Sequence, residues 1–396
     1  MVTGKGKTFR KSFAAYSMMF GFYYFAFTFL YSFYSVHMLS MGFLPSKVSL
    51  AITICQVVTV LTNFLVSIIV NDGNRRTLGV VMVILACTGA AGLMICESFV
   101  GMALSYALAS ASFGCLAPVC ELIGANSRHN YGRIRVFGTW GCAIAMQIAG
   151  LIYDHISPRA VYGTGIIGFL LFLIGFIGTQ EKNEKLASAK KPDTGGEKIS
   201  FRSLFGYRQF VIYLAIAFVY YAASSVLGSY VTPMLKDEGI NVSLLSTFLF
   251  LAVMCETPFI FLSTRYTKLM SFRTMLFIPY GIQLFMYICY TFSTPLWLKV
   301  AAMCIGKHVG PVMYTLTNIQ AVKHLLPDRL QTKAFSLIQV ISGIGNMLMI
   351  NIFGNILDNN SYADSFRIPF IVCLAGACLV ALFRFCGNKE SELSAE

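Results

Sequence analysis

Five ionisable side chains interrupt the long apolar stretches of this 396-residue sequence. Glu121 and Arg135 lie near the ends of two such stretches, whereas Glu256, Lys307 and His308 lie well inside two others. A carboxylate accepts hydroxyl hydrogens and a guanidinium offers a planar fork of donors, so the first two side chains are suited to binding a polyhydroxylated molecule. A carboxylate beside a histidine or lysine is suited to taking up and releasing a proton.

The composition places these groups in a membrane protein. Hydrophobic residues make up 57% of the chain and charged residues only 12%, about half of the usual ~25% in soluble proteins. That is too few charges to cover a soluble globule, so the net charge of +13 does not indicate a nucleic-acid surface. A charged side chain at the centre of a spanning helix costs at least about 2.5 kcal/mol unless it is paired or hydrated.

Each of the five groups also has a purely structural interpretation. Glu121 and Arg135 are close enough to the ends of their stretches to reach the membrane interface by extending their side chains. Glu256 and the Lys307–His308 pair are too deep for that, and their structural alternative is a buried ion pair between two helices. The functional alternative is a hydrated central cavity in which these groups hold a polar ligand or a proton.

Twelve stretches are long enough to cross a membrane as helices, because about 20 mainly apolar residues span ~30 Å of hydrocarbon. The stretches are unbroken rather than alternating, which favours helices over a β-barrel. We therefore predict an all-α membrane protein with twelve transmembrane helices. The predicted spans are 13–38, 48–70, 78–96, 100–123, 136–156, 161–179, 209–235, 242–262, 275–292, 295–321, 334–357 and 368–386.

A polar segment divides the twelve spans into two sets of six. Residues 180–208 are rich in charged residues and glycine, which predicts a flexible cytoplasmic linker between an N-terminal half, 1–179, and a C-terminal half, 209–396. The loops after the second and the eighth predicted spans are both basic. This repetition suggests a duplicated unit, as in the major facilitator fold, where two parallel six-helix halves surround a central cavity.

The basic residues predict the orientation. Of the 30 Lys and Arg residues, 24 fall on one side of the predicted membrane and 5 on the other. Cytoplasmic loops carry such an excess of basic residues. We therefore expect a multi-pass protein of the plasma membrane with both termini in the cytoplasm, surrounded by membrane lipid.

Two neighbouring motifs resemble a known family. One is Pro118-x-x-Glu121, and the other is Tyr131-Gly-Arg-x-Arg135-x-Phe-Gly at the start of the fifth span. Together with the aromatic run that follows Phe20-Gly21, they resemble the lactose-permease-like, oligosaccharide:proton symporter branch of the major facilitator superfamily. The resemblance in span pattern covers nearly the whole chain.

The resemblance implies roles for individual residues. Glu121 and Arg135 match the carboxylate–guanidinium pair that binds sugar hydroxyls, and Tyr34 matches an aromatic residue that lines the substrate site. Glu256 matches a carboxylate that couples sugar binding to protonation, and we hypothesise that it carries the proton with His308 or Lys307 as its partner. Glu256 and His308 are also candidate substrate ligands. Asp72, Arg75 and Arg76 resemble the cytoplasmic gating motif, although their spacing is shorter than the usual Asp-x-x-Gly pattern.

The chain departs from this branch at positions that matter for specificity. Cys142 stands where the branch stacks a tryptophan on a galactosyl ring. Trp140 lies five residues after Arg135, which puts it about 140° around the helix from the Arg135 face. The span-ten histidine and proton-carrying glutamate of the branch fall on Gly306 and Val309. Galactoside preference and the usual proton site are therefore not expected.

The leading hypothesis is a secondary transporter, not an enzyme, that imports a neutral polyhydroxylated solute with a proton. A di- or oligosaccharide is the first candidate solute, and a nucleoside:proton symporter is the nearest alternative. A non-transporting sensor built on a transporter fold and an exporter of amphipathic compounds are further alternatives. We expect no cofactor, no metal, no nucleic-acid partner and, by analogy with the superfamily, a monomer.

Overall fold

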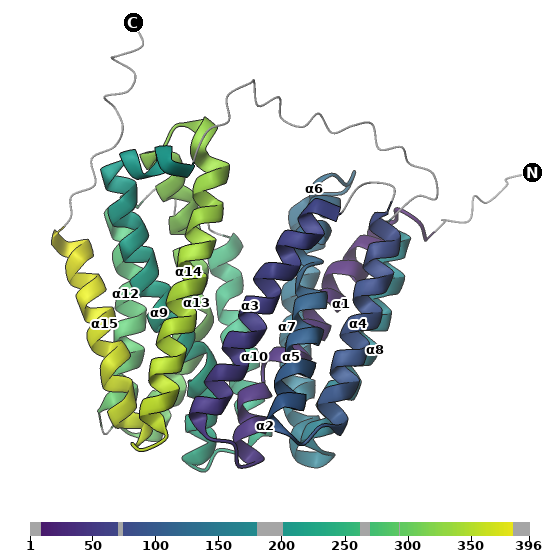
Figure 1. Ribbon diagram of the computed structural model, residues 1–396, viewed down its shortest axis with the longest axis horizontal. Helices are drawn as coiled ribbons and strands as arrows, with labels where there is room; N and C mark the ends of the chain where they lie inside the picture. Colours follow the sequence, from purple (N-terminus) through teal and green to yellow (C-terminus); the bar gives the residue numbers. More distant parts are fainter. Residues whose placement is uncertain (1–8, 70–73, 180–200, 262–269, 293, 383–396) are drawn as a thin grey trace, which may run out of the picture. The chain divides into compact units, whose positions relative to one another are not determined.

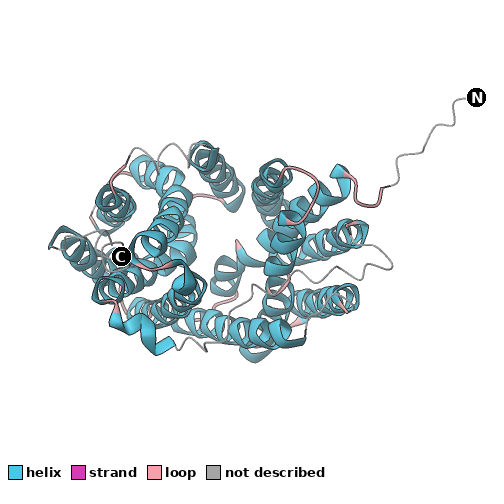
Figure 2. Cartoon of the chain, turned by 90° about the horizontal axis from the view of Figure 1, so that it is seen from above, coloured by secondary structure: helices cyan, strands magenta, loops and turns pink. Residues whose placement is uncertain are grey.

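The computed structural model describes residues 9–69, 74–179, 201–261, 270–292 and 294–382 (Figure 1). All the regular structure in these residues is helical, with no strand among them (Figure 2). The prediction of an all-α protein is thereby confirmed. The chain divides into two compact units, of which the first comprises residues 1–193 and 239–250 and the second residues 194–238 and 251–396.

The first unit contains the first six predicted spans. Two of these spans are each broken into two helices, at Ser32–Phe33 and at Cys115–Leu116. The second break precedes Pro118, which lies in the first turn of its helix, where a missing N–H is tolerated. The helices are α1 (Phe13–Tyr31), α2 (Tyr34–Ser40), α3 (Pro45–Ile69), α4 (Arg75–Ile95), α5 (Phe99–Gly114), α6 (Ala117–Ala125), α7 (Tyr131–His155) and α8 (Pro158–Gly178).

The other six predicted spans follow the predicted linker. Residues 180–200 of that linker lie outside the described part of the chain. The end of that linker forms a 3-10 helix, η1 (Phe201–Gly206). The long helices are α9 (Arg208–Asp237), α10 (Val242–Phe261), α12 (Phe272–Thr291), α13 (Leu296–Leu325), α14 (Asp328–Leu357) and α15 (Tyr362–Leu382). The part of α10 that precedes Leu251 is grouped with the first unit and the remainder with the second.

The described helices satisfy the length that a bilayer requires. Eleven helical segments are long and apolar enough to cross a membrane, counting α1 with α2 and α5 with α6 as single spans. The twelfth, α13, has 30 residues and carries Lys299, Lys307 and Lys323, which lower its hydropathy. Each predicted span thus corresponds to a helical segment, with ends shifted by a few residues.

Helix packing shows that the two units repeat one arrangement. In the first unit α1 packs on α7 and α8, and α4 packs on α5 and α8. In the second unit α9 packs on α14 and α15, and α12 packs on α13 and α15. The first span of each set of six therefore contacts the fifth and sixth, and the third contacts the fourth and sixth. This is the duplication that the repeated basic loops suggested.

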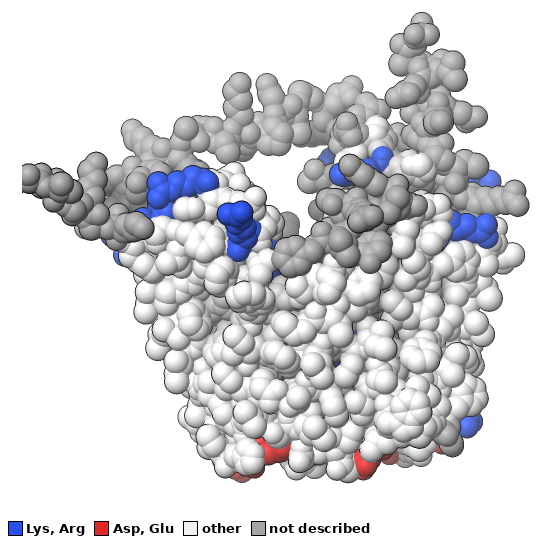
Figure 3. Space-filling view, turned by 180° about the vertical axis from the view of Figure 1, so that it is seen from behind, with Lys and Arg blue, Asp and Glu red and all other residues white. Residues whose placement is uncertain are grey.

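Charged side chains lie mainly at the helix ends. On the face shown in Figure 3, most of the visible Lys and Arg side chains gather at the upper end, and Asp and Glu side chains lie at the lower end. Arg75 and Arg76 begin α4, and at the opposite end of that helix Glu97 forms an ion pair with Arg159. The cytoplasmic orientation inferred from these residues stays a prediction.

Candidate functional site

Glu121 on α6 and Arg135 on α7 form an ion pair. The side chain of Asn130 accepts a hydrogen bond from the Arg133 backbone N–H at 3.2 Å, which caps α7 so that the helix begins at Tyr131. Arg135 follows one turn later, and its Nε donates to Glu121 Oε1 at 3.0 Å. The two side chains are 32% and 34% exposed, so the pair is not sealed inside the helix packing.

Two tyrosines complete this cluster, and neither was among the predicted site residues. The Tyr24 hydroxyl accepts from Arg135 Nη2 at 2.7 Å and donates to Glu121 Oε1 at 3.3 Å. The Tyr24 ring lies 4.2 Å from Arg135 Cζ, a cation–π contact. The Tyr131 hydroxyl donates to Glu121 Oε2. We call Tyr24, Glu121, Tyr131 and Arg135 the α1–α6–α7 cluster.

Glycines let α1 approach α7 closely enough to build the cluster. A Cβ atom at Gly141 would lie 2.1 Å from the carbonyl oxygen of Gly21, closer than any real contact. A Cβ atom at Gly138 would lie 2.7 Å from the Tyr24 ring and 2.8 Å from Arg135 Nη1. Without side chains at these two positions, the Tyr24 ring can lie against the guanidinium.

The cluster is chemically suited to a neutral solute that carries hydroxyl groups. The carboxylate and guanidinium cancel each other's charge, so an ionic ligand gains no net attraction there. Carboxylate oxygens accept from hydroxyls, while guanidinium N–H groups donate to them, and phenols do both. A carboxylate or guanidinium forms stronger hydrogen bonds than neutral groups do, which helps to offset the cost of dehydrating a sugar.

Two other aromatic residues singled out in the sequence lie in different surroundings. Tyr34 on α2 is buried, its ring stacks on Tyr106 at 3.7 Å, and its hydroxyl donates to the Met102 carbonyl at 3.5 Å. These contacts attach Tyr34 to α5 and not to the α1–α6–α7 cluster. Trp140 is half exposed and packs beside Phe137, with 5.7 Å between ring centroids.

In the second unit, Glu256 on α10 is paired with His308 on α13. Glu256 Oε2 lies 3.3 Å from His308 Nδ1, and the two side chains are only 15% and 22% exposed. Among the described atoms, His308 Nε2 is buried and has no hydrogen-bond partner. Lys307 points to a different partner, because its Nζ donates to Thr232 Oγ1 on α9 at 2.9 Å. Of the two partners considered for Glu256, the geometry thus favours His308.

Of the predicted gating residues, Arg75 and Arg76 are the first two residues of α4, and Asp72 lies outside the described residues. Just before them, the Asn74 side chain donates to the Ile69 carbonyl at 2.8 Å. This bond joins the end of α3 to the beginning of α4.

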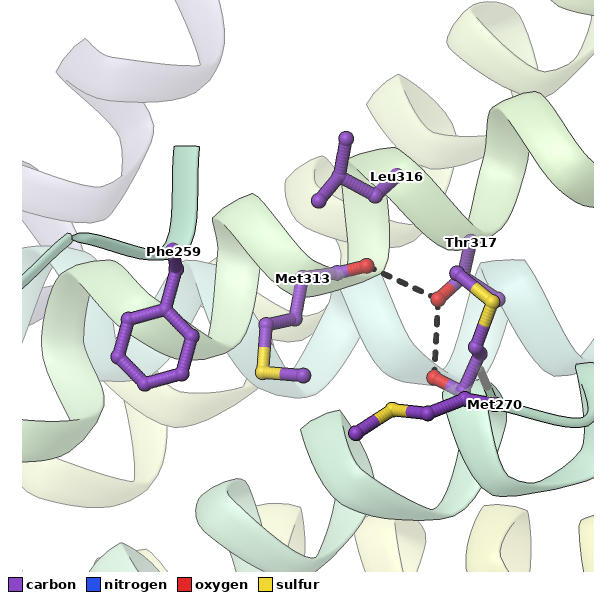
Figure 4. Close-up of a pocket in the computed structure, with 6 residues that line it drawn as sticks. Phe259, Met270, Met313, Leu316 and Thr317 are labelled. Carbon is purple, nitrogen blue, oxygen red and sulfur yellow. Dashed lines mark hydrogen bonds between the residues drawn. The ribbon is translucent and has the colours of Figure 1, made fainter. Parts of the chain in front are cut away.

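A small pocket in the second unit does not resemble a sugar site (Figure 4). Its lining comes from the end of α10, the residue preceding Ser271, α12 and α13. The only polar side chain among its described lining residues is Thr317, whose hydroxyl lies 2.9 Å from the carbonyl oxygens of both Met275 and Met313. The lining residues are Phe259, Met270, Met275, Met313, Leu316 and Thr317. In the part of the chain that the structure describes, no group of three His, Cys, Asp or Glu residues is placed to hold a metal ion.

Comparison with known sequences finds a family and two curated relatives. The model of the family described as "MFS_1 like family" matches residues 13–390. An uncharacterized transporter of Bacillus subtilis, YwbF, is 24% identical over 317 residues, which are 77% of each chain. A maltose permease of Geobacillus stearothermophilus is 22% identical over 320 residues, 78% of this chain and 79% of that protein.

Solved structures share the fold at low sequence identity. The nucleoside transporter NupG has a TM-score of 0.75 at 14% identity, covering 95% of this chain and all of that one. A D-xylose-proton symporter has a TM-score of 0.72 at 12% identity, covering 95% of this chain and 98% of that one. At such identities the likeness establishes the major facilitator fold and not the substrate.

Proposed function

Because the chain belongs to the MFS_1 like family, and so to the major facilitator superfamily of membrane transporters, we propose that it imports a neutral polyhydroxylated solute together with a proton. A di- or oligosaccharide is the first candidate. The two halves would expose the solute alternately to either side of the membrane. In this proposal the protein acts as a monomer in the plasma membrane, with both termini in the cytoplasm.

The α1–α6–α7 cluster is the observation that carries the proposal. It offers a neutral ion pair and two phenols within hydrogen-bond distance of one another, and the pair is not sealed inside the helix packing. The curated relative named maltose permease supports a sugar as the solute. A disaccharide supplies several hydroxyls on one face, so that it can replace the bonds between the cluster and water.

Glu256 and His308 supply a candidate site for the coupled proton. A carboxylate and an imidazole at 3.3 Å can share or exchange a proton, and both groups are largely shielded from solvent. We propose that Glu256 is the proton carrier and His308 its alternating partner. Lys307, held by Thr232, would stabilise the deprotonated carboxylate by its positive charge.

A nucleoside is the second candidate solute, and the rings around Arg135 favour it. Arg135 Cζ lies 4.2 Å from the Tyr24 ring centroid and 5.8 Å from that of Phe20, and Phe20 and Tyr131 meet edge to face. Phe20 is buried, whereas the Tyr131 ring is 41% exposed and would stack on a base while the ion pair bound the ribose hydroxyls. The fold shared with NupG is compatible with this alternative.

Uptake measurements in cells test the proposal and separate its alternatives. Cells expressing the protein should accumulate labelled maltose or labelled uridine above the external concentration, and a protonophore should abolish that accumulation. Cells carrying an empty vector give the background. The transport proposal is refuted if no solute of a panel of neutral glycosides and nucleosides enters faster than this background.

A further inference from the structure

Both carboxylate oxygens of Glu121 are occupied by hydrogen bonds from the protein itself. Oε1 accepts from Arg135 Nε at 3.0 Å and from the Tyr24 hydroxyl at 3.3 Å, and Oε2 accepts from the Tyr131 hydroxyl. A carboxylate oxygen has two lone pairs, so both lone pairs of Oε1 are in use and one of those of Oε2. A solute hydroxyl that donates to Glu121 therefore approaches Oε2, where the Tyr131 hydroxyl is bound.

The two tyrosines are held very differently. Tyr24 lies in the middle of α1, its hydroxyl bridges Arg135 and Glu121, and its ring lies against the guanidinium. Tyr131 is the first residue of α7, is 41% exposed, and its ring meets Phe20 edge to face at 6.2 Å. Because Tyr131 is the more exposed of the two, water can take over its hydrogen bonds when its side chain rotates, so Tyr131 can leave Glu121 while Tyr24 stays in place.

We propose that the Tyr131 hydroxyl occupies the position on Glu121 that a solute hydroxyl takes when the solute binds. It covers Glu121 Oε2 until a solute displaces it, and Tyr24 keeps Oε1 and the guanidinium aligned throughout. This inference rests on the proposed function for the identity of the solute. The covering of Glu121 by Tyr131 can be tested without any solute.

The geometry also defines the chemical class of solute. Once Tyr131 moves away, Oε2 accepts from one hydroxyl, while the guanidinium next to it has five N–H donors and uses two of them on Glu121 and Tyr24. A neighbouring hydroxyl of the same molecule can accept from this guanidinium. The cluster therefore selects solutes with two adjacent hydroxyl groups, a feature common to pyranosides and to the ribose of nucleosides.

The first test needs no solute and measures the reactivity of Glu121. Purified protein is treated with a water-soluble carbodiimide and an amine, and labelling of the Glu121 peptide is followed by mass spectrometry. Tyr131→Phe keeps the ring but removes the covering hydroxyl, so we expect Glu121 to be labelled about threefold faster or more. Tyr23→Phe is the matched control, because its hydroxyl donates to the Phe113 carbonyl at 3.5 Å and its labelling should equal wild type. Equal labelling rates in Tyr131→Phe and wild type would overturn the proposal.

The second test measures equilibrium binding of labelled maltose and labelled uridine to the purified protein. Removing the competing hydroxyl should tighten binding of the recognised probe about three- to tenfold in Tyr131→Phe, whereas Tyr24→Phe should weaken it. A deoxy analogue that lacks one of the two adjacent hydroxyls should bind at least about tenfold more weakly to wild type. Weaker binding in Tyr131→Phe, like that in Tyr24→Phe, would contradict the proposal that the Tyr131 hydroxyl competes with the solute for Glu121. If wild type binds neither probe, the proposed function fails, and the labelling rates alone decide whether Tyr131 covers Glu121.

Discussion

Replacing Arg135 with lysine is expected to lower solute uptake at least about 100-fold. Arg135 donates to Glu121 through Nε and to Tyr24 through Nη2, and its flat guanidinium lies on the Tyr24 ring. Lysine offers a single point charge that cannot reproduce this planar fork. A hydrogen bond from a charged group to a solute hydroxyl contributes roughly 1.5–3 kcal/mol, so losing two such bonds lowers the affinity by about two to four powers of ten. Initial uptake rates of the labelled solute give the measurement.

Arg133→Lys is the matched control for this substitution. Arg133 lies on the same first turn of α7, its side chain is exposed, and its backbone N–H, which caps the helix, is unchanged by the substitution. Uptake should therefore stay within about twofold of wild type, at equal amounts of protein in the membrane. If Arg135→Lys also transports within about threefold of wild type, the guanidinium does not bind the solute.

Replacing Glu256 with glutamine should abolish proton-driven accumulation and leave exchange down a gradient intact. The amide has nearly the same shape and can still face His308 Nδ1, which lies 3.3 Å from Glu256 Oε2 in the wild type. It can neither release a proton nor carry a negative charge, so solute movement is no longer coupled to the proton gradient. Accumulation and counterflow of the same labelled solute, measured in parallel, separate these two activities.

Glu238→Gln is the control for the loss of a carboxylate. Glu238 forms an ion pair with Lys299 at the end of α9, away from the His308 pair. Neither Glu238 nor Lys299 is part of the proposed proton site, so accumulation should persist at equal amounts of protein in the membrane. If Glu256→Gln still accumulates solute, and a protonophore abolishes that accumulation, Glu256 is not the proton carrier.

The charged members of the candidate site were predictable because charge is costly in a membrane. Glu121, Arg135, Glu256 and His308 stood out as ionisable groups in apolar stretches, and the structure places them as two pairs. The choice between Lys307 and His308 was not predictable. Neighbouring residues on a helix point about 100° apart, so the partner depends on how α13 is rotated against α9 and α10.

The uncharged members of the candidate site, Tyr24 and Tyr131, were harder to predict from the sequence. Tyr24 lies in an unbroken aromatic run, Phe22–Phe25, where no residue type marks which ring faces α7. That choice depends on the close approach of α1 at Gly138 and Gly141, a tertiary contact. Tyr131 had a visible signal, because it lies four residues before Arg135 and therefore on the same face of the helix. The break after α5 was also signalled, by Pro118, whereas no proline precedes or follows the break at Ser32–Phe33.

The spans were predictable because their length is set by the bilayer, and the helix ends were less so because capping sets them. Asn130 starts α7 at Tyr131, five residues before the predicted start at residue 136. This extension brings Tyr131 and Arg135 onto one rigid helix. The site therefore depends on a cap that hydropathy alone does not reveal.

A structure of the purified protein with the transported solute bound tests the central claim most directly. We predict density for the solute within hydrogen-bond distance of the Glu121 carboxylate and the Arg135 guanidinium, with the Tyr131 hydroxyl displaced from Glu121 Oε2 and Tyr24 still in contact with Arg135. Solute density elsewhere, with all the hydrogen bonds of the α1–α6–α7 cluster unchanged, would contradict the account.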